Sequence, residues 1–156
     1  MFVKTTQMRI LQVALFLVLS LSIVTGIVVS CSNDETVYVS EVTPSQVLAS
    51  AKWKTTIVKD ANGNDVTNQN TGFVGNAEYK MDGTFIITSF DGTIRSIGDW
   101  SITPDGKRRI LVGKNLNGSG EIIFTRIVDI ITLTPKSFVY AIVVNGQRLT
   151  VEHSPL

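Results

Sequence analysis

Few residues in this chain have side chains suited to covalent or metal chemistry. Cys31 is the only cysteine and His153 the only histidine, which excludes an intramolecular disulfide and a site built from several histidines. No phosphate-binding loop, dinucleotide-binding glycine pattern or G-x-S-x-G motif is present. His153 shares the apolar face of the expected last strand with Leu149 and Val151, which favours a structural role or a solvated terminus over catalysis. These side chains predict a protein that is not an enzyme and needs no cofactor.

The segment Asp60-Ala61-Asn62-Gly63-Asn64-Asp65 is the one candidate for a metal site. It places oxygen side chains at positions one, three, five and six of a loop, which superficially suits Ca²⁺. However, its glycine does not stand where an EF-hand loop needs one, and Thr71 occupies the twelfth position, where a bidentate glutamate is required. The segment therefore favours a turn, and no metal site is predicted.

Arg126 and Asp129 interrupt the most apolar stretch of the chain, residues 121–133. Being three residues apart on a strand, they must point to opposite faces, so one of them is expected to face the interior. An inward charge is costly unless it is paired, so it is either half of a structural ion pair, which we favour, or a ligand contact. The basic run Lys107-Arg108-Arg109 is interpreted as a solvated strand start.

Residues 1–30 have the features of an export signal. Lys4 and Arg9 precede Ile10 to Ser30, a segment that is almost wholly apolar and carries no charge. This segment is about 20 residues long, enough to span a bilayer as a helix. An uncleaved transmembrane anchor and a soluble secreted protein are therefore the alternatives to a cleaved signal.

The residues at the end of this segment, Val28-Val29-Ser30-Cys31, resemble the lipobox of bacterial lipoproteins. The resemblance implies a diacylglycerol on the Cys31 thiol, cleavage between Ser30 and Cys31, and an acyl chain such as palmitate on the new amino terminus. Two or three chains hold a protein to a membrane far more firmly than one. The expected location is the bacterial cell envelope, outside the cytoplasm. The following Ser32-Asn33-Asp34-Glu35 resembles a surface-export signal of Bacteroidetes lipoproteins, with a plain solvated tether as the equal alternative.

The predicted organisation is a signal peptide at 1–30, a lipidated tether at 31–42 and one domain at 43–156. The tether includes a short candidate strand at residues 37–39. Removing the signal also removes Lys4 and Arg9, so the formal net charge changes from +1 to −1. A charge this close to zero provides no electrostatic footprint for nucleic acid.

Turn residues at regular spacing predict the secondary structure of the domain. Thr43-Pro44-Ser45-Gln46 is typical of a helix start with a capping box, and the helix should reach about Ser50. Alternating patterns then predict eight strands, at 53–58, 75–81, 84–90, 93–102, 107–114, 121–133, 137–144 and 147–153. The Asp-Gly and Asn-Gly breaks favour tight antiparallel hairpins.

Such an all-β antiparallel meander is expected to close into a barrel, because closure removes both edge strands. An open sheet and a two-sheet sandwich are the alternatives. A barrel of about eight strands is either packed solid or holds one small ligand. In the strand at 75–81, the alternation places Ala77, Tyr79 and Met81 on the same face. In the strand at 93–102, it places Ile94, Trp100 and Ile102 on the face opposite Thr93, Arg95 and Asp99.

A short helix followed by Trp53 at the head of the first strand resembles the lipocalin and calycin architecture. The glycine that usually stands two residues before this tryptophan is Ala51 here, and Arg148 is the nearest candidate for the arginine that packs against it. Residues 43–50, 59–67, 103–111 and 151–155 further resemble a family of small bacterial secreted lipoproteins, catalogued as a domain of unknown function with lipocalin-like strands. This resemblance implies the fold and the location, and it brings no activity.

The sequence thus predicts a lipid-anchored envelope protein that acts as a non-catalytic binding module for a small apolar or amphipathic ligand. The candidate ligand contacts are Tyr79, Trp100, Arg126 and Tyr140, although core filling is the favoured role of the aromatic residues. The alternative is a protein-interaction or structural module with a solid core. An enzyme is the third hypothesis, which a deep polar cleft containing several aspartates would support.

Overall fold

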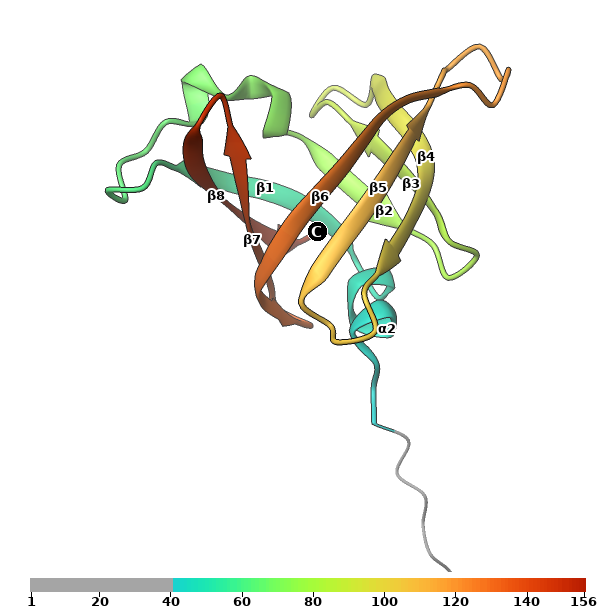
Figure 1. Ribbon diagram of the computed structural model, residues 1–156, viewed down its shortest axis with the longest axis horizontal. Helices are drawn as coiled ribbons and strands as arrows, with labels where there is room; N and C mark the ends of the chain where they lie inside the picture. The colour runs from blue at the N-terminus through green and yellow to red at the C-terminus, as the bar shows by residue number, and fades with distance from the viewer. Residues whose placement is uncertain (1–40) are drawn as a thin grey trace, which may run out of the picture. The chain divides into compact units, whose positions relative to one another are not determined.

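The computed structural model describes residues 41–156, which form one short α-helix, two short 3₁₀ helices and eight β-strands (Figure 1). The elements are α2 (Pro44–Ala49), β1 (Lys52–Lys59), η1 (Thr67–Gln69), η2 (Thr71–Phe73), β2 (Asn76–Tyr79), β3 (Thr84–Thr88), β4 (Ile94–Ile102), β5 (Arg108–Lys114), β6 (Ile122–Thr134), β7 (Ser137–Val144) and β8 (Gln147–Pro155). All eight predicted strands are present. The candidate strand at residues 37–39 lies outside the described residues.

The eight strands form a closed antiparallel barrel in which each strand pairs with the next along the chain. β8 also pairs with β1, from Trp53 opposite Pro155 to Lys59 opposite Thr150. The β7–β8 hairpin turns at Asn145 and Gly146, whose φ values of 51° and 78° suit a two-residue turn of type I′. The predicted all-β meander and its closure are confirmed, and the open sheet and the sandwich are excluded.

α2 lies across one end of the barrel. It begins with the predicted capping box, in which the side chains and backbones of Thr43 and Gln46 bond reciprocally. Leu48 is fully buried, and the indole nitrogen of Trp53 donates a hydrogen bond of 2.8 Å to the Leu48 carbonyl. The helix also contacts β2, β4 and β6, so it covers this end of the barrel.

Aromatic side chains fill the barrel beside α2. The ring of Phe138 lies 5.8 Å from that of Trp53, 6.4 Å from that of Tyr79 and 5.5 Å from that of Tyr140, measured between ring centroids. The largest fully buried side chains are Trp53, Phe85, Phe138, Leu48, Leu111, Val58, Val128 and Val151. This part of the barrel is therefore packed solid.

Two residues that the alternation grouped with buried neighbours, Met81 and Ile94, are exposed. Met81 is 65% exposed because it lies in the turn between β2 and β3, beyond the end of the strand. Ile94 is 51% exposed because the β3–β4 register shifts between Ile87 and Thr88, where Arg95 is the extra residue of a bulge. An extra residue reverses the alternation on the far side of the bulge, which a pattern of period two does not anticipate.

The segment between β1 and β2 packs back against β1. Val66 donates its backbone N–H to the Val58 carbonyl, and Val58 donates to the Thr67 hydroxyl. Arg95 fixes the end of this segment, because its guanidinium donates to the carbonyls of Gly72 and Val74 at 2.9 and 2.6 Å. η1 and η2 thus lie against the barrel end far from α2, as Figure 1 shows.

The barrel wall has a lateral opening between β6 and β7. Their pairing covers only Asp129–Thr134 of β6 and Ser137–Ala141 of β7. Ile122–Val128 therefore pairs with β5 alone, and Ile142–Val144 with β8 alone. Figure 1 shows the two strands diverging over this stretch.

Candidate functional site

A small polar cavity lies inside the barrel below η2. Its volume is about 30 Å³, enough for one or two water molecules. The polar groups around it come from β1, β2, β5, β6, β7 and β8, namely Thr55, Asn76, Tyr79, Arg109, Arg126, Tyr140 and His153. No acidic residue lines it.

Arg109 is 2% exposed, and aromatic rings surround its guanidinium. The guanidinium carbon lies 4.6 Å from the ring centre of Tyr140, 5.3 Å from that of Phe138 and 5.5 Å from that of Tyr79. Nη1 donates a hydrogen bond to the Tyr79 hydroxyl, whereas Nε, though buried, has no hydrogen-bond partner. Cation–π contacts offset part of the cost of burying this charge.

Arg126 adds a second positive charge at the rim of the same cavity. It is half-buried, and its guanidinium lies 5.1 Å from the ring centre of Phe73 in η2 and 5.2 Å from that of Phe124. Burial, together with the charges of Arg109 and Arg95, lowers the pKa of Arg126, against the opposing influence of Tyr140 and Tyr79. Within residues 41–156 the ion pairs are Lys59–Glu152, Arg108–Asp129 and Lys114–Asp99, so neither interior arginine has an acidic partner there.

Burial keeps two other titratable groups of the cavity, Tyr79 and His153, neutral at physiological pH. Burial raises the pKa of the Tyr79 hydroxyl. Burial, and then the charge of Arg109, lowers the pKa of His153 to about 3. Nδ1 of this neutral imidazole lies 3.2 Å from the Phe138 carbonyl, so the Nδ1–H tautomer can donate to it. The cavity thus holds two positive charges and no negative one.

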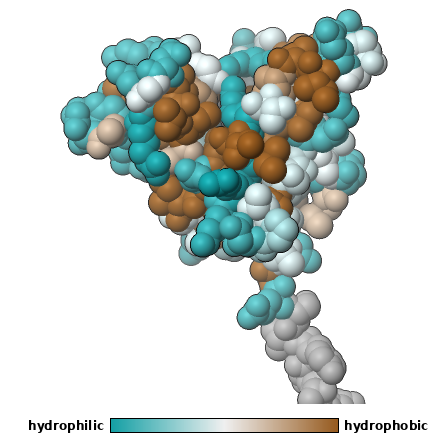
Figure 2. All heavy atoms as spheres, in the orientation of Figure 1, coloured by the Kyte–Doolittle hydropathy of each residue, from teal (hydrophilic) through white to brown (hydrophobic). Residues whose placement is uncertain are grey.

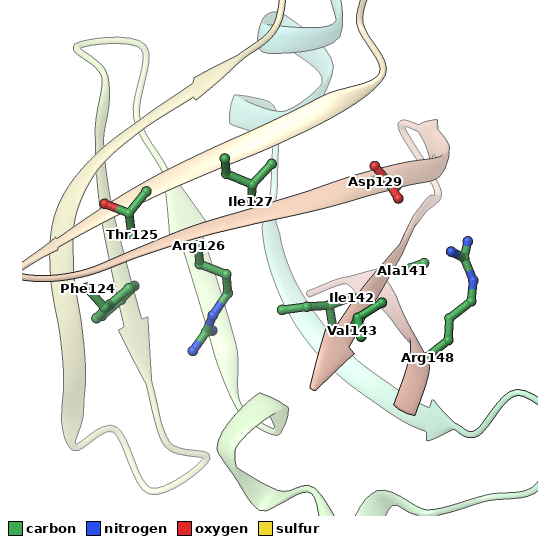
Figure 3. Close-up of a pocket in the computed structure, with 9 residues that line it drawn as sticks. All are labelled: Phe124, Thr125, Arg126, Ile127, Asp129, Ala141, Ile142, Val143 and Arg148. Carbon is green, nitrogen blue, oxygen red and sulfur yellow. The ribbon is translucent and has the colours of Figure 1, made fainter. Parts of the chain in front are cut away.

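The lateral opening lies beside this cavity and has a volume of about 500 Å³. Arg126 lines both spaces, and Phe124 and Ile142 add apolar surface to the opening. Figure 3 shows Arg126 and Ile142 projecting into the space between β6 and β7, with Asp129 and Arg148 farther along.

The barrel face around this opening carries apolar residues on its outside. The exposed residues are Ile122, Ile123, Ile127 and Ile131 of β6 and Val143 of β7. Figure 2 shows apolar patches separated by polar side chains on the face that includes these strands. The opening is therefore bordered by apolar surface inside and outside the wall.

Residues 45–155 match the family described as "Domain of unknown function (DUF4822)". The chain belongs to this family. The family membership predicted from the sequence is thereby confirmed, and the description assigns no activity to its members. No curated protein matches the chain. Among solved structures, a lipocalin-like protein from Bacteroides uniformis is similar, with 16% identity and a TM-score of 0.47 over 70% of this chain and 99% of that one.

Three of the four candidate contacts predicted for this family member meet at the cavity, namely Tyr79, Arg126 and Tyr140. Trp100 does not line it. Its ring packs edge-on against Tyr79 at 5.4 Å, and its indole nitrogen donates to the Lys80 carbonyl. Trp100 is therefore a core residue that supports the site from behind.

The structure places one charged residue differently from the sequence prediction and settles the orientation of two others. Arg109, expected in a solvated strand start, is buried in the cavity, whereas its neighbour Arg108 is exposed. Of Arg126 and Asp129, Arg126 is the one that reaches the cavity, whereas Asp129 points outward, 3.4 Å from Arg108. The ion pair favoured for the inward charge is not found within residues 41–156, where Arg126 has no acidic partner. Alternation from the buried Leu111 would have placed Arg109 inside, but the adjacent charges and turn obscured that signal.

Arg148 and the Asp60 segment both lie at the surface, away from the cavity. Arg148, the candidate partner of Trp53, is exposed and lies across from Val143 in the β7–β8 hairpin. In the Asp60 segment, the carboxylate accepts hydrogen bonds from the backbone of Asn62 and Asn64, as in a turn. The hydrogen bonds from Asn64 are the main cause that lowers the pKa of Asp60.

Cys31 and Ser30, the predicted lipidation and cleavage residues, lie outside the described residues. None of the helices within residues 41–156 has the length and apolar character needed to cross a bilayer. In that same part of the chain, no three His, Cys, Asp or Glu side chains are grouped so that they could hold a metal ion.

Proposed function

We propose that the chain is a lipid-anchored protein of the bacterial cell envelope that binds one small amphipathic molecule and catalyses no reaction. The observation that carries this proposal is the polar cavity inside an otherwise apolar barrel, with Arg126 shared between the cavity and the lateral opening. Binding sites of this type combine apolar walls with a few convergent polar groups.

The dimensions of the two spaces indicate how such a ligand would lie. The inner cavity accepts only a small head group, whereas the opening, at about 500 Å³, is large enough for an apolar chain. Phe124 and Ile142 would contact the chain, and Arg126 would lie where the chain meets the head group. Because the rest of the barrel is packed solid, the ligand would enter through the wall and not through the end that α2 covers.

The test is native mass spectrometry of the full-length protein, extracted from its host's membranes in a mild detergent. We expect an additional mass that leaves on denaturation, and its fragmentation would identify the ligand class. The substitution Phe124→Ala should reduce the fraction of loaded protein several-fold, because it removes apolar contact area at the opening. Arg108→Gln, on the outer face of the adjacent strand, should leave that fraction unchanged. A bare polypeptide mass in every preparation would contradict the proposal.

The second candidate is a protein-interaction module. It is favoured by the unpaired edge of Ile122–Val128 and by the exposed isoleucines beside it, because such an edge can accept a strand from another chain. In the same spectra this candidate predicts a dimer or a protein adduct in place of a small molecule. Replacing Ile127 with lysine on the outer face would then abolish the complex.

A further inference from the structure

The interior of the barrel has an unbalanced charge. Arg109 comes from β5 and Arg126 from β6, and both guanidinium groups reach the same cavity. The groups that face them from the other strands are the hydroxyls of Thr55, Tyr79 and Tyr140, the amide of Asn76 and the neutral imidazole of His153. None of these groups is a carboxylate.

A buried charge without a counterion is costly, so proteins rarely retain one without a use. The cation–π contacts and the Tyr79 hydroxyl satisfy Arg109 only in part, because its buried Nε–H has no acceptor. An arginine serving only to fill space would be replaced without loss by an apolar side chain of similar volume. The unpaired Nε–H lies beside a second guanidinium in a cavity whose lining includes no carboxylate, so the site is suited to an acceptor that carries negative charge.

The size of the cavity restricts this acceptor. A volume of about 30 Å³ accommodates a planar carboxylate, which a guanidinium binds through two parallel hydrogen bonds, more readily than a bulkier tetrahedral group. The apolar part of such a ligand must leave the cavity past Arg126, the residue common to the cavity and the opening. It would then contact Phe124 and Ile142.

We propose that Arg109 and Arg126 form a carboxylate-binding site for a monocarboxylic acid whose apolar chain leaves the barrel between β6 and β7. This inference rests on the proposed function, because it specifies the head group of the ligand bound there. Arg109 would hold the carboxylate from within, and Arg126 would close over it from the rim, with Phe73 of η2 packed on its guanidinium.

The test compares ligands that share one chain and differ in head group. Octanoate, octanol, octyl phosphate and octyltrimethylammonium are titrated calorimetrically at pH 7.5 into the full-length lipidated protein in nanodiscs, with empty nanodiscs as the blank. We expect octanoate to bind at least tenfold more tightly than octanol, because only the acid forms charge-assisted hydrogen bonds with both arginines. The cationic probe should not bind measurably.

Three substitutions to methionine, which keeps an unbranched apolar stem and removes the charge, assign the effect to residues. Arg109→Met and Arg126→Met should each weaken octanoate binding at least tenfold and leave octanol binding unchanged. The matched control Arg108→Met, on the exposed face of the same strand, should change neither. Without ligand, Arg109→Met should unfold at the same or a higher denaturant concentration, because it removes a buried unpaired charge. If that variant does not fold, the half-buried Arg126 still provides the test.

The outcomes separate the two proposals. Equal binding of octanoate and octanol would overturn the carboxylate site and leave the amphipath-binding function standing. Tighter binding of octyl phosphate would overturn the assignment to a carboxylate, and binding of acetate as tight as that of octanoate would overturn the role of the chain. If none of the eight-carbon probes binds, the proposed function itself fails. Loss of stability in Arg109→Met with unchanged octanoate affinity would make Arg109 purely structural.

Discussion

At the scale of single residues, a guanidinium and an imidazole, those of Arg109 and His153, share one aromatic cluster. Both side chains contact Phe138 and Tyr140, yet Arg109 is charged whereas burial and the nearby guanidinium keep His153 neutral. The guanidinium can carry its charge there because aromatic faces and a hydroxyl surround it. The imidazole has only one carbonyl within hydrogen-bond reach of its Nδ1.

The lowered pKa of His153 predicts that stability depends on pH. The unfolded chain takes up a proton near pH 6.5, whereas the folded chain resists protonation to about pH 3. Stability is therefore complete above pH 6.5 and falls as the pH drops below it, by about 1.4 kcal/mol per pH unit at most. Urea unfolding of the full-length protein should show a loss of about 2 to 3 kcal/mol between pH 6.5 and 4.5.

The control for this prediction is His153→Phe, which retains a planar ring and cannot titrate. Its stability should be nearly flat over the same interval, because His153 is the only histidine of the chain. Aspartates with a lowered pKa, such as Asp60 and Asp82, contribute only as the pH falls below their unfolded pKa of about 4. A wild-type protein whose stability is also flat would show that His153 is not buried as described.

At the scale of elements, two glycines determine how closely β4, β5 and β6 approach one another. Gly98 lies opposite Gly113 across the β4–β5 ladder, and Gly113 lies opposite Phe124 across the β5–β6 ladder. A Cβ on Gly113 would overlap the Phe124 ring, and one on Gly98 would overlap the Val112 carbonyl. The missing side chains thus provide the space in which Phe124 reaches the lateral opening.

We therefore expect Gly98→Ala to be strongly destabilising. Its φ of 156° is unfavourable for an L-residue, and the overlap with the Val112 carbonyl involves backbone that no rotamer change can relieve. The loss in free energy of unfolding should be about 2 kcal/mol or more, measured by urea titration. Gly72→Ala, at a position with open space around a Cβ, is the matched control and should be nearly neutral. Equal stabilities of the two variants would contradict the close approach.

The same elements show what the sequence could and could not predict. Turn residues such as Asn145-Gly146 act locally, so the eight strands and their hairpin connections were predictable. The bulge at Arg95 and the separation of β6 from β7 depend on how whole strands twist and pair, and no short pattern encodes them. Tyr79, Arg126 and Tyr140 were identified as candidates by residue type, but Arg109 was missed because its neighbours indicate a solvated turn.

At the scale of the whole molecule, the proposed anchor depends on one thiol. Cys31→Ser should abolish lipidation, since a hydroxyl is a far weaker nucleophile than a thiolate. It should also leave the signal segment uncleaved, because the lipobox pattern implies cleavage of the lipidated form. Wild-type protein labelled with radioactive palmitate should stay in the detergent phase of a two-phase extraction, and the variant should carry no label. A labelled variant would show that acylation occurs elsewhere, and an unlabelled wild type that the chain is not a lipoprotein.

The seam between β1 and β8 imposes an order on the folding of the domain. It joins the first strand to the last, with Trp53 opposite Pro155, so the ladder that closes the barrel has nearly the largest sequence separation the domain allows. Val151 and His153, both buried, arrive with that final strand. The domain therefore cannot complete its core before β8 has been synthesised and has reached β1. Such non-local closure makes folding slow, because the cost of closing so long a loop precedes the contacts that repay it.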